Sequence, residues 1–427
     1  MMVRKTLRSF LILISSIMFM YCSACSWGGV FNSVNKQTVH LYGDVKYITD
    51  LAPSLDEEFD LQAVQWTSDS MEERRKVLIE RLKTDPPDAL ILPENEARLL
   101  YQEGYLENLL PQYQTSLSER IVPSLIEAEK KNDALSGIPI HTTPLIVYYN
   151  KQWFDKANLP YPDETWGWEQ FAEISGSLMK SNCSASDEGC YGHMMPFNLS
   201  YLGPLIKGFG GEIVNPEDGS AEGYLNGEST EQALLWAKHL ITSDKIAPVV
   251  WNWNYSSANE MQKSITFYQD AFIQNKIGMI VESTFIYSDF KGALLTDLGV
   301  AGIPSSQRGT HYNESHGTLV LSIPKASENK QAAWELLTTL FRHVKVESSE
   351  EAASLINFPV IRTQPSGNKD VDIVSQAISN IVNTDLARDL YSYAEPYMER
   401  ILNSGDWELH NILSEIVSGY ELLQNGM

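Results

Sequence analysis

The stretch Ser136–Asn150, with the sequence SGIPIHTTPLIVYYN, constrains the fold more than any other part of this chain. Leu145–Tyr149 is an unbroken run of branched and aromatic residues, which is typical of a strand buried on both faces. Pro139 and Pro144 exclude a helix and cannot donate hydrogen bonds to a central ladder. Fifteen extended residues at about 3.3 Å each reach roughly 50 Å. The stretch is therefore either a core strand with a kinked start or a segment that leaves one domain and enters another.

Strand and helix patterns alternate on the amino-terminal side of this stretch. This order predicts parallel pairing with right-handed crossovers, and ligands of such sheets lie beyond the carboxyl ends of the strands. The expected strands are Thr38–Tyr42, Phe59–Trp66 and Asp88–Leu92, and the expected helices are Ser70–Lys83, with a Ser70/Glu73 capping box, and Asn95–Gln102. The residues at the strand ends are Tyr42, Asp44, Trp66, Glu94 and Asn95.

Helices and strands also alternate on the carboxyl-terminal side. The expected helices are Trp166–Leu178 with Thr165 as cap, Leu199–Phe209, Glu228–Ser243 with Ser229 as cap, Phe267–Gln274, Asn329–Arg342, and Val371–Met427 with a break at Gly405. The expected strands are Tyr191–Phe197, Lys276–Val281, Leu298–Gly302 and Gly317–Ile323. Trp251 and Trp253 fall in a predicted loop, and we expect at least one of them to contact a ligand, with core packing as the alternative.

The first 37 residues carry export and tethering signals. Three basic residues precede the apolar run Phe10–Met20, which is too short to span a bilayer and fits a signal peptide. The small residues Ser23 and Ala24 before Cys25 predict a lipoprotein signal, residues 1–24, with Cys25 acylated; simple secretion is the alternative. Residues 25–37 read as a flexible tether.

Two cysteines lie outside this leader, Cys183 and Cys190, and they flank a polar, turn-rich loop. An exported protein meets oxidising conditions, so we expect a disulfide that closes this loop. Six residues separate the pair and no histidines cluster beside it, which argues against a redox or zinc site.

The acidic balance of the chain excludes several classes of partner. Without residues 1–24 there remain 29 basic and 55 acidic residues, a net charge of −26. Such a surface repels nucleic acid and gives no basic platform for anionic lipid. No cofactor motif, metal-binding cluster or nucleophile elbow occurs. A glycoside hydrolase with two carboxylates stays open as an alternative, although no motif identifies the pair.

Four segments in a fixed order resemble the extracellular solute-binding proteins of ABC importers, the group of maltose-binding protein and many sugar receptors. The likeness extends from about Thr38 to Met427. The segments are LPENEARLLYQEGYLENLLP (Leu92–Pro111), GIPIHTTPLIVYYNKQWFDKANLP (Gly137–Pro160), FIQNKIGMIVESTFIYSDF (Phe272–Phe290) and SIPKASENKQAAWELL (Ser322–Leu337).

The resemblance implies an α/β fold of the two-lobed periplasmic-binding-protein type, with the ligand in a cleft between lobes joined by crossing hinge segments. The first crossing is then expected near His141–Pro144, the second near His311–Gly317, and a third after Arg342. Residues 38–142 with 312–343 would form lobe one, and residues 143–311 with 344–427 would form lobe two.

The resemblance also implies ligand-binding positions. Phe285 and Tyr287 stand where maltose-binding protein has two tryptophans, one of which stacks on the sugar. Asn198, Ser200 and Tyr201 match a segment with polar and aromatic contacts, and Glu94 or Asn95 matches an acidic contact. Thr143 stands where that protein has an acidic residue, a departure that argues against maltodextrin itself. The remaining expected contacts are Tyr42, Asp44, Trp66, Trp251 and Trp253.

The expected function is that of a non-enzymatic receptor. It would bind a small molecule, with a sugar or oligosaccharide favoured, and deliver it to ABC permease subunits. It would act as a monomer outside the cell, lipid-anchored to the outer face of the membrane, or in the periplasm of a Gram-negative host, without a cofactor or nucleic-acid partner. Two further roles stay open for such a fold, ligand sensing for a membrane kinase and, with weaker support, metal transport.

Overall fold

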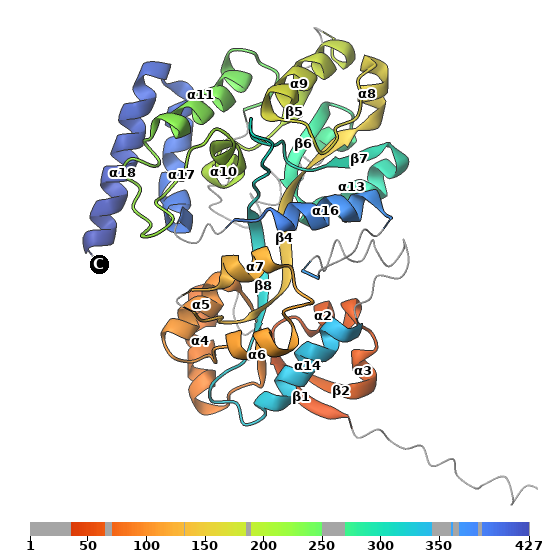
Figure 1. Ribbon diagram of the computed structural model, residues 1–427, viewed down its shortest axis with the longest axis vertical. Coiled ribbons are helices and arrows are strands. Elements are labelled where there is room, and N and C mark those ends of the chain that lie inside the picture. Colours follow the sequence, from red (N-terminus) through yellow and green to blue (C-terminus); the bar gives the residue numbers. More distant parts are fainter. Residues whose placement is uncertain are drawn as a thin grey trace, which may run out of the picture.

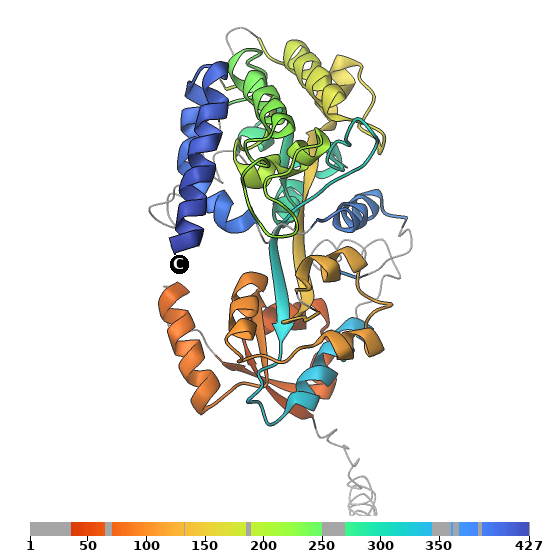
Figure 2. The same cartoon turned by 60° about the vertical axis from the view of Figure 1, so that its left-hand side comes forward.

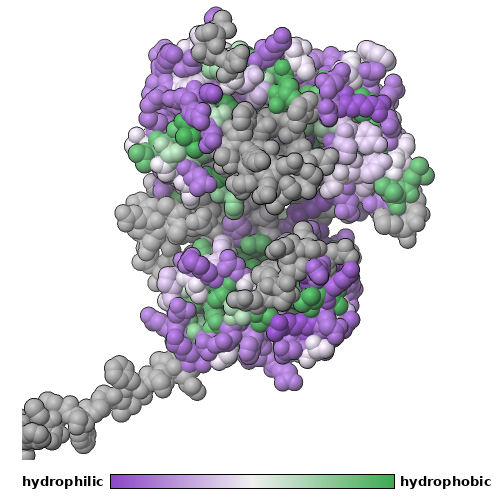
Figure 3. Space-filling view, turned by 180° about the vertical axis from the view of Figure 1, so that it is seen from behind, coloured by the Kyte–Doolittle hydropathy of each residue, from purple (hydrophilic) through white to green (hydrophobic). Residues whose placement is uncertain are grey.

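Two lobes joined by a narrow waist make up the molecule (Figure 1, Figure 3). In the computed structural model of the protein, the described residues are 36–64, 71–131, 133–184, 189–249, 270–343, 360–361, 367–382 and 387–426. Two strands, β4 (Ile138–Asn150) and β8 (Ser315–Ser322), run side by side through the waist (Figure 1, Figure 2). Through them the hydrogen-bonded strand order β2-β1-β3-β8-β4-β6-β5 continues from one lobe into the other.

The lower lobe in Figure 1 contains the amino-terminal strands and their helices. As predicted, β1 pairs in parallel with both β2 and β3, whereas β3 pairs antiparallel with β8. The elements of this lobe are β1 (Gln37–Tyr42), α2 (Val45–Leu51), α3 (Leu55–Glu58), β2 (Phe59–Val64), α4 (Met71–Thr84), β3 (Ala89–Pro93), α5 (Glu94–Gln102), α6 (Leu110–Ser116), α7 (Pro123–Glu129) and α14 (Lys330–His343).

The upper lobe is built around β4, β6 and β5, with β7 also paired to β4. β6 and β7 pair antiparallel with β4, and β5 pairs in parallel with β6. The elements of this lobe are α8 (Lys151–Ala157), α9 (Trp168–Asn182), β5 (Tyr191–Met194), α10 (Leu199–Gly208), α11 (Glu228–Thr242), β6 (Ile277–Ser283), η1 (Thr284–Ile286), α13 (Tyr287–Leu294), η2 (Leu295–Asp297), β7 (Leu298–Ala301), α17 (Arg388–Asn403), η4 (Asp406–Glu408) and α18 (Leu409–Gly426).

The long strand β4 confirms that the stretch Ser136–Asn150 crosses from one lobe to the other. Its first half pairs with β8 and its second half pairs with β6 and β7. Pro139 and Pro144 lie within the strand, although proline has no N–H to donate to a ladder. The structure accommodates them where the β4–β8 register shifts, between Pro139 and His141 and between Thr142 and Pro144, because an irregular ladder does not need every N–H.

The helix α16 (Lys369–Ser379) lies at the waist, on the side of β4 away from α17 in both ribbon views (Figure 1, Figure 2). It packs against β4 and against α7 of the lower lobe. The Ser124 hydroxyl of α7 donates a 2.7 Å hydrogen bond to the carbonyl of Ile378. This helix therefore belongs to the connection between the lobes.

Two of the predicted helix caps are wrong. Gly167, not Thr165, precedes α9, and its N–H donates to the Gln170 side chain. Gly227, not Ser229, precedes α11. Glycine lacks the side chain by which a cap is recognised in a sequence, so both caps were placed on a neighbouring hydroxyl residue.

The predicted disulfide is confirmed, since Cys183 and Cys190 are joined. It closes the loop between the end of α9 and the start of β5.

The predicted cap Ser70 lies outside the described residues. No helix within the described ranges is both long and apolar enough to cross a bilayer.

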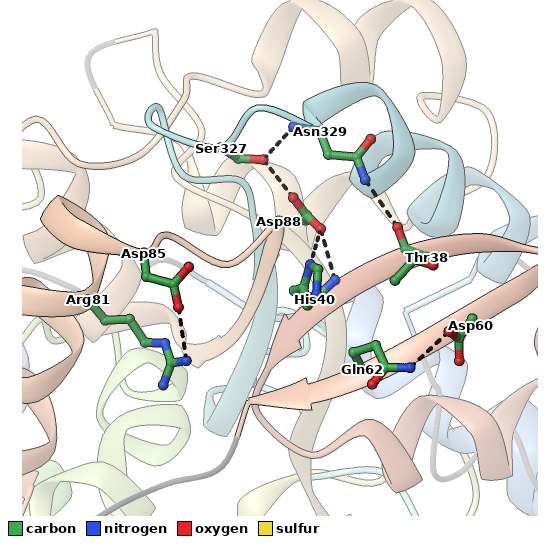
Figure 4. Close-up of polar contacts among 9 residues, drawn as sticks. All are labelled: Thr38, His40, Asp60, Gln62, Arg81, Asp85, Asp88, Ser327 and Asn329. Carbon is green, nitrogen blue, oxygen red and sulfur yellow. Dashed lines mark hydrogen bonds and ion pairs between the residues drawn. The ribbon is translucent and has the colours of Figure 1, made fainter.

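A buried carboxylate ties three parts of the lower lobe together (Figure 4). Asp88, 6% exposed, accepts hydrogen bonds from the His40 backbone N–H at 2.9 Å and from the Ser327 hydroxyl at 3.1 Å. His40 lies on β1, Asp88 directly precedes β3, and Ser327 lies between β8 and α14. The carboxylate therefore fixes the edge of the sheet from which the β8 chain leaves for α14.

We expect Asp88→Ala to lower the free energy of unfolding by about 2–4 kcal/mol, because it leaves the His40 N–H and the buried Ser327 hydroxyl without their acceptor. Asp85→Ala is the matched control three residues away. Asp85 is exposed and pairs with Arg81 one turn away, so its loss costs less than about 1 kcal/mol. Urea unfolding of both variants measures the difference, and equal losses would contradict this role of Asp88.

Candidate functional site

A cleft of about 380 Å³ opens at the waist between the two lobes. Four chain segments contribute to its wall: the start of α5 below, the start of α10 above, the beginning of β8, and the first two turns of α17. The lining residues are Asn95, Asn198, Leu199, Ser200, Glu314, Ser315, His316, Gly317, Arg388, Tyr391, Ser392 and Glu395.

Three predicted contact residues line this cleft, Asn95 from the lower lobe and Asn198 and Ser200 from the upper lobe. Asn95 follows β3 on the first turn of α5, and its side-chain oxygen accepts from the Glu96 N–H at 2.8 Å. Asn198 is the N-cap of α10, where its side-chain oxygen accepts from the Tyr201 N–H at 3.0 Å and the Ser200 hydroxyl at 2.8 Å. Each carboxamide is therefore oriented by the helix start that carries it.

The crossing segment into β8 forms the floor of the cleft. Asn313 holds it to β4: its side chain accepts from the Leu145 N–H at 3.0 Å and donates to the Leu145 carbonyl at 2.8 Å. The Thr142 hydroxyl lies 2.8 Å from the Ser315 hydroxyl. Polar side chains thus join the two crossing strands at the prolines, where their ladder is irregular.

Glu314 is the most deeply buried carboxyl group in the cleft wall, at 2% exposure. Burial raises its pKa to about 8, although the Tyr391 hydroxyl hydrogen-bonds both carboxyl oxygens, at 3.0 and 3.1 Å, and lowers it in part. The carboxyl packs directly on Gly203 of α10, where a Cβ atom would overlap it. Glu314 is therefore protonated and uncharged at neutral pH.

His316 lines the cleft, and Tyr201 of α10 packs against its ring. Their rings meet edge to face with centroids 4.3 Å apart, and His316 Nε2 donates to the Ser200 carbonyl at 3.2 Å. Burial lowers the pKa of His316 to about 4, so the ring is neutral. The Tyr201 hydroxyl donates to Glu282 at 2.6 Å, and burial raises the pKa of that carboxyl. Tyr201 thus supports the wall through His316.

Glu94 and Arg388 form an ion pair between the lobes. Glu94 begins α5 of the lower lobe and is 2% exposed, whereas Arg388 begins α17 of the upper lobe with 32% of its side chain exposed. Burial lowers the pKa of Arg388. The carboxylate predicted to contact the ligand is therefore paired with an arginine that itself lines the cleft.

The other predicted contact residues lie at different depths. Thr143 is buried and donates to the Gly317 carbonyl at 3.4 Å, next to the cleft. Tyr42 is buried in a core cluster with α4 and α5, and Asp44 caps α2. The Tyr287 hydroxyl donates to Asp370 at 2.8 Å. Phe285 is 77% exposed on η1, directly after β6.

Four predicted positions, Trp66, Trp251, Trp253 and the lipidation site Cys25, lie outside the described residues. Conversely, the ionisable side chains of the cleft wall were not predicted from the sequence: Glu314, His316, Arg388, Tyr391 and Glu395. The first two fall within the predicted second crossing and could have been found there. The three residues of α17 had no signal, because their helix is distant in sequence and nothing in its pattern shows which face meets the cleft.

A second cavity of about 400 Å³ lies between α16, the chain before α9 and the end of β7. Asp163, Trp166, His311 and Asp372 are among its lining residues. It has walls from the upper lobe and the waist, whereas the cleft has walls from both lobes, as a site that closes around a ligand requires. Within the described ranges, no group of three or more His, Cys, Asp or Glu side chains is arranged to hold a metal ion.

We expect the stability of the protein to fall between about pH 4.5 and pH 8 through Glu314, by at most about 1.4 kcal/mol per pH unit. In this window the folded chain keeps a proton that the unfolded chain has released, because the folded pKa is raised from 4.5 to about 8. Glu314→Gln removes this slope, and the exposed Glu415→Gln keeps it. Unfolding at several pH values measures both, and a parallel curve for Glu314→Gln would contradict the assignment.

Comparisons with known proteins agree with this architecture. The family model described as bacterial extracellular solute-binding protein matches residues 59–344. A putative binding protein of Brucella abortus is 24% identical over 277 residues, 62% of each chain. The galactooligosaccharide-binding protein of Bacillus subtilis is 20% identical over 286 residues. The chain spans 62% of the length of these curated relatives.

One solved structure shares the fold of this protein over the whole length of the solved chain. The sugar-binding protein MalE of Xanthomonas citri superposes with a TM-score of 0.69 at 16% identity, covering 92% of this chain and 100% of that one. Its likeness agrees with the two-lobed fold described above. The family consists of binding proteins. With the family model matching well over half of the chain, the protein belongs to the bacterial extracellular solute-binding proteins.

Proposed function

We propose that the protein captures an uncharged carbohydrate in the cleft at the waist and delivers it to the membrane subunits of an ABC importer. One observation carries the proposal: polar side chains of both lobes and of the crossing segment face a single cleft, including Asn95, Asn198 and His316. A ligand that contacts both walls at once favours the arrangement in which the lobes are together.

The chemistry of the cleft supports a polyol. Carboxamide, hydroxyl and imidazole groups exchange hydrogen bonds with sugar hydroxyls without a net charge on the ligand. The protonated Glu314 is hydrogen-bonded by Tyr391 rather than free to attract a cation. The relatives named for galactooligosaccharides and for sugar support the same class of ligand.

Phe285 is our candidate for the aromatic platform. It follows the carboxyl end of β6, three residues after Glu282, which bonds to Tyr201 of the cleft helix α10. An aromatic ring that is 77% exposed gains from covering by the C–H face of a sugar. Trp251 and Trp253 remain candidates for further stacking contacts.

The lobes would close by bending at the crossing strands. We retain residues 38–142 with 312–343 as lobe one and residues 143–311 with 344–427 as lobe two. The irregular β4–β8 ladder at Pro139–Pro144 supports a hinge there, because a shifted register has fewer regular hydrogen bonds to resist bending.

We assign the protein to the outer face of the cell membrane, held by an acyl chain on Cys25 and the tether of residues 25–37. It would act as a monomer. The monomeric state is supported by the face drawn in Figure 3, where the visible hydrophobic residues form small scattered groups rather than one broad patch.

A thermal-shift screen tests the ligand class. A carbohydrate at 100 times its dissociation constant stabilises the folded protein by about 2.7 kcal/mol and raises the melting temperature. We expect this shift with at least one neutral mono- or oligosaccharide. A shift with amino acids or peptides and none with a broad carbohydrate panel would contradict the proposal.

Phe285→Ala should weaken binding of the carbohydrate found in the screen by about 1–3 kcal/mol through loss of the stacking face. Trp407→Ala is the matched control, since Trp407 is an aromatic residue of similar exposure, 78%, on η4 between α17 and α18. Isothermal titration calorimetry compares the two variants. Equal affinities would exclude Phe285 as a contact and leave the cleft itself in place.

A further inference from the structure

Four charged side chains of alternating sign, Arg388, Glu94, Arg98 and Glu129, lie on α17, α5 and α7. On α5, Glu94 and Arg98 lie one turn apart, and Arg98 Nη2 is 3.8 Å from the Glu129 carboxylate of α7. The side chains of Arg98 and Glu129 are 13% and 7% exposed. Arg388 of the upper lobe pairs with Glu94.

The charges of these four residues are divided unequally between the two lobes. The lower lobe alone contributes two carboxylates and one guanidinium, a net charge of −1, and Arg388 brings the total to zero. Arg388 and Glu129 also line one small pocket together with Ser315 and Thr318 of β8. The guanidinium therefore completes a charge balance that the lower lobe lacks by itself.

We propose that Arg388 and Glu94 form a latch that holds the two lobes together before any ligand arrives. The pair exists only while α17 and α5 face each other across the cleft. Separation of the lobes takes the guanidinium away from a carboxylate that is 2% exposed, and water must then hydrate both charges. An interaction present in one arrangement and absent from the other shifts the equilibrium between them.

The latch acts at the site of ligand entry, since Arg388 also lines the cleft. Because the proposed ligand favours the same closed arrangement, the latch pre-organises the empty receptor, and loss of the latch lowers the apparent affinity. Arg388 is thus a positioning residue that sets how often the cleft opens. This inference rests on the lobe movement in the proposed function, but not on the identity of the ligand.

The test measures the shape of the ligand-free, full-length protein by small-angle X-ray scattering. Arg388→Glu should raise the ratio of open to closed molecules on the order of tenfold, and so increase the radius of gyration. The double variant Arg388→Glu with Glu94→Arg restores the pair in reverse and should return the radius toward that of the wild type.

Arg400→Glu is the matched control. Arg400 lies on the same helix, but it pairs with Glu415 of α18 within the upper lobe, so its reversal should leave the radius unchanged. Arg388→Gln, which removes the charge and keeps a polar side chain, is the second variant in case charge reversal prevents folding. It should also increase the radius.

An unchanged radius for a folded Arg388→Glu or Arg388→Gln variant would overturn the latch, as would a double variant that stays as open as Arg388→Glu. Because no ligand is added, these outcomes leave the carbohydrate proposal untouched. A failed carbohydrate screen in turn leaves the scattering result valid.

Discussion

The antiparallel pairing of β4 with β8 is the constraint on which the rest of the structure depends. These two strands join the strands of the lower lobe to those of the upper lobe, so the position of each lobe is set by the same few residues at the waist. Two prolines interrupt the regular ladder there, and side chains replace part of what is lost. Asn313 binds both backbone groups of Leu145, and the hydroxyl of Thr142 bonds across to Ser315. The connection is thus held by specific polar contacts as well as by an interrupted ladder.

The same crossing segment supplies the floor of the cleft, so hinge and binding site share residues. Glu314 and His316 lie one and three residues after Asn313. Burial keeps Glu314 protonated and His316 neutral, and each is hydrogen-bonded to a neighbour from the upper lobe. A bend in the segment therefore moves two uncharged polar groups together with the wall they belong to. This coupling follows from chain order alone, because a residue next to a hinge must move when the hinge does.

Local order along the chain was largely predictable from sequence, whereas the meeting of distant elements was not. The apolar run Leu145–Tyr149 identified a doubly buried strand, whereas the crossing at Ser136–Asn150 was expected only together with the family resemblance. Periodicity reports which face of an element is buried, so it predicted the parallel strands of the lower lobe. It does not report what covers that face. The antiparallel pairing of β3 with β8 and the pairing of Arg388 with Glu94 join segments more than two hundred residues apart. No local pattern encodes these pairings or the approach of α17 to the cleft.

The net charge of the protein acts on ligands at long range, whereas the individual charged groups at the cleft act at contact distance. The net charge of −23 gives a field that repels anions before contact. At the cleft, Glu314 is protonated, Glu94 is paired with Arg388, and Glu282 accepts a hydrogen bond from the Tyr201 hydroxyl, whereas Glu395 also lines the wall. An uncharged polyol meets donors and acceptors already oriented by helix starts and the crossing segment.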